Sequence, residues 1–333
     1  MLLEYNASIN AVDVRGYTPL HVAVEAGHDT LTREIIKNTR ASVNETSLSG
    51  RTPLHVAAAK GFLCCITALL ENSDDVNAKA SGGFTALHFA ASEGFTDIVN
   101  LLLNDPRTDE NAMSETGLTP LHLASLADRG STVSLLLGNK MCRKVKAEGG
   151  LLPLHLAATA GHTKIVAILM NHYLDHINIK SLDGFTPLHL AISRKHEATV
   201  LELLRSDRTE INLQGEGGLT ALHLAAVSEL KLDIVKRLVE SGADLNIRDT
   251  NGSDRTEINL QGEGGLTALH LAAVSELKLD IVKRLVEKGA DLNIRDTNGY
   301  TALDLVSRSN PSSPIKFMER LCYDLFRLRS PSN

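Results

Sequence analysis

The sequence predicts an all-α solenoid, a linear stack of short helix-turn-helix units. Three observations predict this fold: a tetrapeptide recurs every 33 or 34 residues with one interval of 47, a helix-start signal opens each copy, and an amphipathic segment follows it. A period near 33 is typical of repeats that bury their apolar faces only by stacking on their neighbours. We therefore expect one elongated array instead of the two compact domains that a length of 333 residues would suggest.

The recurring tetrapeptide is Thr-Pro-Leu-His or Thr-Ala-Leu-His, with one Leu-Pro-Leu-His copy. Threonine is a good helix N-cap, and proline suits the first helical turn because its missing N–H would be unpaired there anyway. We interpret each histidine as a cap and a bridge that bonds the Thr hydroxyl and a backbone group of the adjoining unit, not as a ligand or base. A ninth copy ends in Asp304, and the histidines are His21, His55, His88, His122, His155, His189, His223 and His270.

The remaining elements of a unit follow in order after Gly83, which marks a turn. Thr85 starts a first helix and Gly94 ends it. A second helix carries apolar residues at i, i+3 and i+4 spacing from Ile98 to Leu103, a stripe that would pack on the first helix and on the next unit. A polar turn then closes the unit. In one repeat Val145 stands at the position that asparagine occupies in the others. The asparagines are Asn10, Asn44, Asn77, Asn111, Asn178, Asn212, Asn246 and Asn293.

The unit resembles the ankyrin repeat. The resemblance rests on the Gly-x-Thr-Pro-Leu-His-x-Ala-Ala core, on the Gly-His pairs at 27–28 and 161–162, and on the Gly-Ala-Asp-x-Asn turns at 242–246 and 289–293. It covers essentially the whole chain. It implies a β-hairpin finger and two antiparallel helices in each unit, an L-shaped stack, and a protein partner bound on the concave face.

The chain departs from this pattern at four helix ends. Asp128, Lys195, Glu229 and Glu276 stand where the helix-ending glycine is usual. Because glycine is the residue that adopts the left-handed conformation most easily, we expect these turns to be less sharply capped. The fourth, sixth, seventh and eighth repeats should then be the softer ones.

A duplication interrupts the register late in the chain. Residues 206–252 recur at 253–299 with a single difference, Ser241 against Lys288, and the 47-residue interval exceeds a 34-residue unit by 13. A recent natural duplication, an engineered one and an error in assembling the sequence would each produce this pattern. The stack either continues past a bulge at 244–265, with a hairpin around Asn251-Gly252, or breaks into two arrays. We favour the bulge because insertions in solenoids usually map to loops on one face.

These patterns divide the chain into five segments. We expect a partial repeat at 1–15, seven repeats at 16–252, an inserted finger segment at 253–265, an eighth repeat at 266–298, and a closing repeat with its tail at 299–333. The start resembles the closing half of a repeat, which leaves Leu2 and Leu3 without a capping helix. The chain is then either a segment of a longer protein or covered there by something else. Residues 315–326 have an apolar face that fits a capping helix or, alternatively, a partner-docking helix.

Charge and cysteine usage limit the partners and the compartment. The net charge is −6 and the 34 basic residues are scattered, so we expect no nucleic-acid partner. Charged residues interrupt every apolar run, so direct membrane insertion is not expected. Cysteines at 64, 65, 142 and 322 lack the spacing of a zinc site, which favours a reducing, cytoplasmic or nuclear location. His172 and His176 could bind a metal ion only together with a third ligand. The sequence shows no such ligand, so we expect no metal.

No motif supports catalysis, and we expect neither an enzyme nor a cofactor. The sequence has no Gly-x-x-x-x-Gly-Lys-Ser/Thr loop, no Gly-x-Ser-x-Gly elbow and no His-Glu-x-x-His pair. The glycine-rich stretches at 215–218 and 262–265 each carry a glutamate that would repel a phosphate, so we interpret them as tight turns.

The surface positions predict where a partner would bind. The residue after each turn glycine is mostly apolar or aromatic, and a stack would align these residues along one edge, where aromatic residues anchor partners. We expect Tyr17, Phe84 and Phe185 to dominate binding of an extended segment; the alternative is that these residues only cover the hairpin of the next unit. The full predicted set is Tyr17, Arg51, Phe84, Leu118, Leu151, Phe185, Leu219 and Leu266, with Glu25, Lys60, Glu93 and Arg194 beside them.

Two functions remain open at this level. The preferred one is a protein-interaction scaffold or adaptor, a monomeric array that binds a peptide or a folded domain. The alternative is the ankyrin segment of a larger protein, such as a mind bomb-type ubiquitin ligase or a membrane-linked ankyrin adaptor. The resemblance also implies a modification, because asparagines in such finger turns are substrates of an asparaginyl hydroxylase. Asn77, in Asp75-Val76-Asn77-Ala78, fits that context best, although a purely turn-forming role is favoured.

Overall fold

The computed structural model describes residues 8–38, 41–139, 145–228, 230, 232–250, 264–275 and 279–309. The chain forms two compact units, Met1–Ala157 and Ala158–Asn333. Several predicted features lie outside the described residues: Leu2 and Leu3, Cys142, Cys322, Glu229, Glu276, the central part of the bulge and the helix at 315–326.

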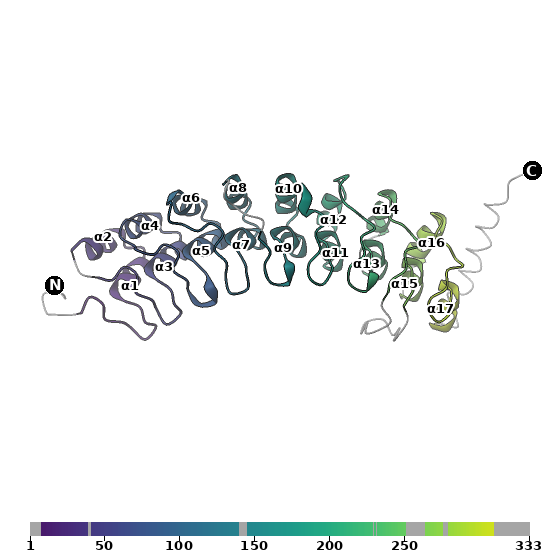
Figure 1. Ribbon diagram of the computed structural model, residues 1–333, viewed down its shortest axis with the longest axis horizontal. Helices are drawn as coiled ribbons and strands as arrows, with labels where there is room; N and C mark the ends of the chain where they lie inside the picture. The colour runs from purple at the N-terminus through teal and green to yellow at the C-terminus, as the bar shows by residue number, and fades with distance from the viewer. Residues whose placement is uncertain are drawn as a thin grey trace, which may run out of the picture. The chain divides into compact units, whose positions relative to one another are not determined.

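Helix pairs stack in the first unit. The odd-numbered inner helices form one row and the even-numbered outer helices a second row (Figure 1). α1 packs on α3, α3 on α5 and α5 on α7, while α2, α4, α6 and α8 pack in the same order. The helices are α1 (Pro19–Glu25), α2 (Asp29–Asn38), α3 (Pro53–Lys60), α4 (Leu63–Leu70), α5 (Ala86–Glu93), α6 (Thr96–Asn104), α7 (Pro120–Leu126) and α8 (Gly130–Gly138), and α9 (Pro153–Ala160) spans the division between the units.

The second unit repeats this arrangement. Here α11, α13, α15 and α17 form the inner row, and α10, α12, α14 and α16 form the outer row. The helices are α10 (Thr163–His172), α11 (Pro187–Ser193), α12 (Glu197–Leu203), α13 (Ala221–Val227), α14 (Leu232–Glu240), α15 (Ala268–Val274), α16 (Leu279–Glu287) and α17 (Ala302–Ser309). The predicted all-α repeat architecture is therefore confirmed for the described chain.

The core lies between the two rows of helices. In the second repeat, Leu54 of α3 is buried from one row, and Ile66 and Leu69 of α4 from the other. The i, i+3 stripe predicted for the second helix of the next repeat is buried as well, at Ile98 and Leu102. A unit of this size can exclude water from these side chains only by stacking on its neighbours, which is why the period predicts the fold.

Helix ends follow the sequence signals, with two informative exceptions. Gly61 ends α3 at φ +82°, and a Cβ there would lie 2.8 Å from the ring of Phe95. Asp128 and Lys195 replace glycine at this position of their repeats, and both still adopt left-handed φ angles of 59° and 63°. The turn is therefore imposed by the surrounding stack, at a conformational cost of about 1 kcal/mol for a residue with a side chain. Whether these repeats are softer stays a prediction.

The fingers are hydrogen-bonded turns, and no strand forms in the part of the chain that the structure describes. In the second finger, Ser47 N–H donates to the Arg51 carbonyl at 2.9 Å and Gly50 N–H donates to the Ser47 carbonyl at 2.8 Å. Successive fingers are tied by single bonds, such as Leu48 N–H to the Arg15 carbonyl at 3.0 Å. Two residues on each side are too few for the ladder that would define a β-hairpin.

The duplicated segment enters and leaves the stack at one finger. Asp249 N–H donates to the Leu266 carbonyl at 2.9 Å, and Gly265 N–H donates to the Asp249 carbonyl at 3.1 Å. These bonds match those of Ser47 with Arg51 and Gly50, although Asp249 lies 17 residues from Leu266 and 16 residues from Gly265 in sequence. The finger thus closes around residues 251–263, which are thirteen in number and lie outside the described residues. Beyond them α15 packs on α13, as inner neighbours do elsewhere.

Candidate partner-binding surface

A row of buried histidines forms hydrogen bonds with the backbone at several of the predicted binding positions. In each repeat that has the Thr-x-Leu-His motif, the histidine Nδ1 lies 2.7 to 2.9 Å from the threonine hydroxyl. Its Nε2 lies 2.9 to 3.3 Å from a carbonyl of the next repeat. Those carbonyls belong to the residues after the turn glycines, and all of these residues except Tyr300 are predicted to bind a partner. The predicted role of the histidines as caps and bridges is therefore confirmed.

The hydrogen bonds determine the charge state of these rings. Thr52 N–H donates to His55 Nδ1 at 3.0 Å, so Nδ1 is an acceptor and the proton is assigned to Nε2, which donates to the Phe84 carbonyl. Burial lowers the pKa of His55, His88, His122 and His189 from 6.5 to about 4. The rings are neutral structural groups at physiological pH, unsuited to act as bases.

The fifth repeat shows what the threonine contributes. Leu152 stands at the N-cap in place of threonine, and His155 Nδ1 accepts from the Leu152 N–H at 3.1 Å. The ring stays buried nonetheless. Backbone geometry therefore retains the histidine where the hydroxyl is missing.

The predicted binding residues differ in exposure. Leu219 and Leu266 are only 8% and 3% exposed, which corrects the prediction of an apolar stripe open along its whole length. Their side chains are covered in the second unit. The rest of the stripe is half-buried, at Tyr17, Arg51, Phe84, Leu118, Leu151 and Phe185, and the flanking Lys60, Glu93 and Arg194 are exposed, whereas Glu25 is half-buried.

An aromatic cluster lies on the inner side of the second and third repeats. The Arg51 guanidinium carbon lies 4.7 Å from the centre of the Phe89 ring. The Phe84 ring makes an edge contact with Phe89, with the ring centres 6.2 Å apart. All three residues are half-buried, so part of each side chain faces solvent. We call Arg51, Phe84 and Phe89 the inner patch.

The first repeat carries a related pair with its charge neutralised. The Arg15 guanidinium lies 4.1 Å from the Tyr17 ring, and that ring stacks on His21 with the centroids 5.0 Å apart. Arg15 also pairs with Asp13 at 3.1 Å and with Glu25 at 3.0 Å. Hydrogen bonds from the Tyr17 backbone and from Arg15 lower the pKa of Asp13. The predicted binding residue Glu25 is therefore engaged within its own repeat.

Phe185 occupies the matching position in the second unit. Its ring lies 6.0 Å from that of His189, and a Cβ on Gly215 would lie 2.8 Å from its edge. Part of this side chain therefore covers the next finger, as the alternative interpretation of the stripe expected. Because it is only half-buried, the exposed remainder is still open to a partner.

The position directly after each histidine carries further surface residues that are not among the predicted binding residues. Phe89 is there in the third repeat, and Val22, 45% exposed, is there in the first. Leu126, three residues further along its helix than the equivalent Leu123, is 44% exposed. A signal was available: this position is apolar in every repeat although it follows the buried histidine on a short helix.

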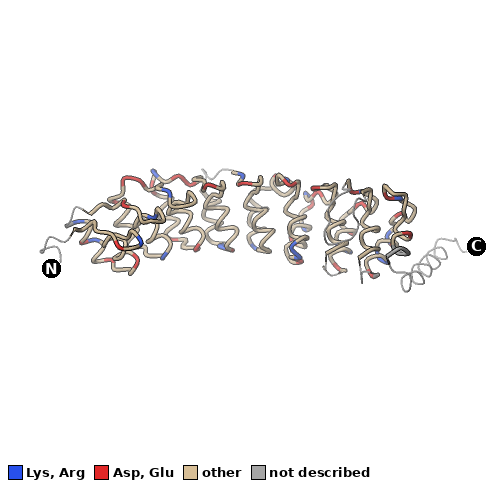
Figure 2. The backbone as a smooth tube through the Cα atoms, turned by 90° about the horizontal axis from the view of Figure 1, so that it is seen from below, with Lys and Arg blue, Asp and Glu red and all other residues tan. Residues whose placement is uncertain are grey.

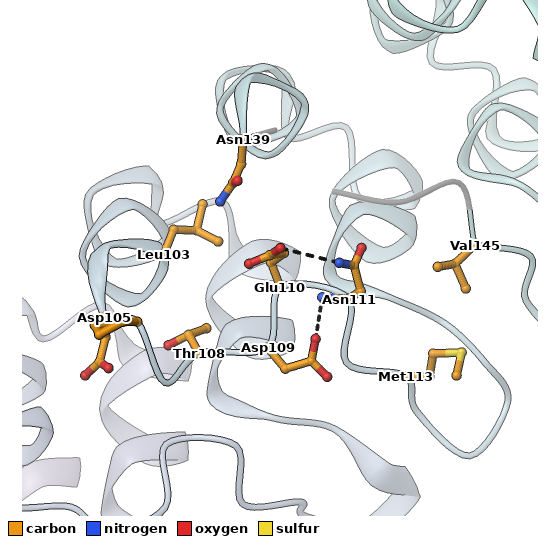
Figure 3. Close-up of a pocket in the computed structure, with 10 residues that line it drawn as sticks. Leu103, Asp105, Thr108, Asp109, Glu110, Asn111, Met113, Asn139 and Val145 are labelled. Carbon is orange, nitrogen blue, oxygen red and sulfur yellow. Dashed lines mark hydrogen bonds between the residues drawn. The ribbon is translucent and has the colours of Figure 1, made fainter. Parts of the chain in front are cut away.

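An open groove of about 640 Å³ lies elsewhere in the first unit, where the loop after α6 meets the chain around α8. Figure 3 shows Asp109 accepting from the Asn111 N–H at 3.0 Å, and the Asn111 amide contacting Glu110 at 3.5 Å. None of the predicted binding residues lines this groove. Its lining is acidic and apolar: Leu103, Asp105, Pro106, Thr108, Asp109, Glu110, Asn111, Met113, Asn139 and Val145.

No metal or cofactor site emerges from the described residues. Nowhere among them do three or more His, Cys, Asp or Glu side chains gather as a metal would need. His176 is 3% exposed and stacks on Tyr173 with ring centres 4.6 Å apart. The glycine-rich stretch at 215–218 forms a turn with positive φ at Gly217 and Gly218. No helix of the described chain is long and apolar enough to span a bilayer, and charges of both signs are interspersed along the chain (Figure 2).

The turn asparagines tie successive repeats together on the outer side. Asn77 Nδ2 donates to the Arg107 carbonyl at 2.7 Å, and its Oδ1 accepts from the Asp109 N–H at 2.8 Å. Asn178 makes the same pair of bonds with the following repeat. Both polar atoms of the Asn77 amide are thus used structurally. Hydroxylation of Asn77 stays a prediction, which a mass increase of one oxygen on treatment with an asparaginyl hydroxylase would test.

Stacked helix pairs with bridging histidines and a surface that varies between repeats define a repeat protein. A family model described as Ankyrin repeats (3 copies) matches residues 1–80, 22–113, 59–147, 87–181, 127–215, 175–249 and 251–324. The chain belongs to the ankyrin-repeat family. Ankyrin repeats are generally protein–protein interaction modules. Comparison with curated proteins gives no match.

Proposed function

We propose that this chain is a scaffold or adaptor that binds a protein partner on its inner face, without catalysis of its own. The observation that carries the proposal is the inner patch. Its two aromatic rings and its guanidinium are held in place by neighbouring side chains and remain partly open to solvent. Rigid, half-exposed aromatic and arginine side chains are the residues that dominate protein interfaces.

The predicted anchors fit this role unequally. Phe84 belongs to the inner patch, and Phe185 has a similar half-buried position in the second unit. The ring of Tyr17 stacks on its own repeat's histidine and is paired with Arg15, so it contributes less free surface. We therefore expect Phe84 to contribute most to affinity, followed by Phe185 and then Tyr17.

The test measures affinity and folding together. A partner recovered by affinity capture and identified by mass spectrometry is titrated calorimetrically against the parent chain and the Tyr17→Ala, Phe84→Ala, Phe185→Ala triple variant. We expect the dissociation constant to rise at least about tenfold. Thermal unfolding should change little, because all three rings are only half-buried.

The matched control removes apolar surface from the outer helices. Leu31, Leu63 and Leu201 are 43%, 42% and 42% exposed on α2, α4 and α12. Their triple alanine variant should keep the parent affinity. If this control weakens binding as much as the inner-face variant, or if the inner-face variant binds normally, the proposed surface is wrong.

A further inference from the structure

Two arginine–aromatic pairs lie in neighbouring repeats of the first unit and differ in one respect. Arg15 over Tyr17 and Arg51 over Phe89 have similar geometry, at 4.1 and 4.7 Å from the ring centres. Arg15 is bonded by the carboxylates of Asp13 and Glu25. The side chain of Arg51 makes no hydrogen bond and no ion pair with any residue that the structure describes. The chain thus provides its own comparison between a neutralised and an unneutralised cation.

The surroundings of Arg51 make its charge available to a ligand. Its guanidinium rests on the Phe89 ring, which attracts a cation without competing for its N–H donors. The nearby His55 is neutral because burial lowers its pKa to about 4. A half-buried cation is less screened by water than an exposed one, so a carboxylate that reaches it gains more from pairing. Arginine also offers a planar fork of donors that fits a carboxylate with two parallel bonds.

The apolar rings beside Arg51 limit what carries that carboxylate. The Arg51 guanidinium carbon lies 4.7 Å from the centre of the Phe89 ring, which in turn lies 6.2 Å from the centre of the Phe84 ring. Side chains at i and i+2 of an extended segment lie on one face about 6.6 Å apart. An extended segment can therefore place an acidic side chain on Arg51 and an apolar one on the rings at the same time.

We propose that Arg51 binds the carboxylate of an Asp or Glu in an extended segment of the partner protein, while an apolar residue within two positions packs on Phe84 and Phe89. This inference rests on the proposed function, since it names the kind of partner that the inner patch accepts. The Arg15–Tyr17 pair, with two carboxylates of its own chain already bound, does not perform this role.

The test uses a displayed library of random twelve-residue peptides selected on the full chain. We expect enrichment of sequences with Asp or Glu within two positions of Phe, Leu, Ile or Met. A selected peptide should bind Arg51→Gln at least about tenfold more weakly than the parent chain and bind Arg15→Gln normally. Thermal unfolding of Arg51→Gln should change little, because the guanidinium makes no hydrogen bond in the described chain, although the variant loses a contact over the Phe89 ring.

A double-mutant cycle distinguishes direct pairing from a general effect of charge. Replacing the acidic residue of the peptide by its amide should weaken binding to the parent chain and have no further effect on Arg51→Gln. Arg51→Lys should restore only part of the affinity, because it keeps the charge and loses the fork. Additive losses would overturn the proposal.

Two further outcomes separate this inference from the proposed function. If peptides lose affinity in Phe84→Ala, Phe89→Ala but show no acidic preference and bind Arg51→Gln normally, the carboxylate site is wrong and the inner face remains the binding surface. If the affinity of every selected peptide is independent of Phe84 and Phe89, both the inner patch and the carboxylate site are wrong.

Discussion

Residues 219–250 and 266–297 have the same sequence except at 241 and 288, and their described residues fold alike in different surroundings. Within each copy the local bonds are equal: Thr220 to His223 and Thr267 to His270 both measure 2.7 Å. The bonds to the next repeat differ. His223 reaches the buried Leu266 carbonyl at 3.1 Å, 43 residues away, whereas His270 reaches the half-buried Tyr300 at 3.3 Å, 30 residues away.

The difference between the copies separates two sources of stability. The cap on each inner helix comes from the local motif, so it is the same in both copies. The bridge depends on the repeat that stacks next. The equivalent histidines are therefore bonded to a buried carbonyl, Leu266, in the first copy and to a more accessible carbonyl, Tyr300, in the second. Arg284 of the second copy likewise pairs with Glu240 of the first at 3.6 Å, a contact that local sequence cannot specify.

The largest expected effect comes from removing each histidine in turn. His223→Ala should lower the free energy of unfolding by about 3 kcal/mol, because it removes the ring's bonds to the buried Thr220 hydroxyl and to the buried Leu266 carbonyl, which then keeps its bond from the Asp249 N–H. His270→Ala should cost about half as much, since water can reach Tyr300 more easily. Urea unfolding followed by circular dichroism measures both.

A conservative variant separates the cap from the bridge. Asp304 accepts from the Thr301 N–H and hydroxyl at 2.8 Å, which shows that a short side chain is enough for the cap. His223→Asn should therefore keep the cap, lose the bridge and fall between the parent and His223→Ala. Equal losses at 223 and 270 would mean that the neighbour contributes nothing.

Acid should weaken the fold through the same histidines. Burial lowers the pKa of His189 to about 4 and also lowers that of His270. Above pH 6.5 the rings are neutral in both the folded and the unfolded chain. Below pH 6.5 the histidines of the unfolded chain become protonated, while the buried rings of the folded chain stay neutral. The free energy of unfolding should fall between pH 6.5 and 4, by up to about 1.4 kcal/mol per pH unit for each such histidine. Denaturant titrations across this range would measure the slope, and a flat profile would contradict it.

The smallest expected effect comes from deleting residues 251–263. The bonds of Asp249 with Gly265 and Leu266 already close the finger, so the shortened chain should keep the stack. The free energy of unfolding should rise by about 1 kcal/mol, because a shorter loop costs less entropy to close. Thermal unfolding of the deletion variant measures this; loss of a cooperative transition would show that the segment supports the stack.

The fold was largely predictable because the same local signals for helix starts and buried helix faces recur in each unit. Thr52, Pro53 and His55 predict a helix start, and the structure has α3 beginning at Pro53 with His55 bonded to Thr52. The apolar residues of the second helix predict its buried side in the same way. The expected fingers are present in the described chain as hydrogen-bonded turns without strands, because turns this short bond one residue to the next finger and do not form a ladder.

The candidate site was less predictable because exposure depends on neighbours. Leu118 and Leu219 occupy the same position of their repeats, yet the first is half-buried and the second buried. Phe89 follows a buried histidine, and its partial exposure beside Arg51 comes from the packing of α5 against α3.

The sequence by itself determined the repeat, its helix starts and the capping and bridging role of its histidines, and it favoured a place for the surplus thirteen residues in one finger. These features depend on contacts within a unit or between identical positions of adjacent units. Only the tertiary structure decided that Asp128 and Lys195 take left-handed turns, that Leu219 and Leu266 are covered, and that Arg51 has no carboxylate in the described chain while Arg15 has two. Each of these depends on which side chains the fold brings together, whether from a neighbouring repeat or, for Arg15, from 2 and 10 positions away in the same repeat.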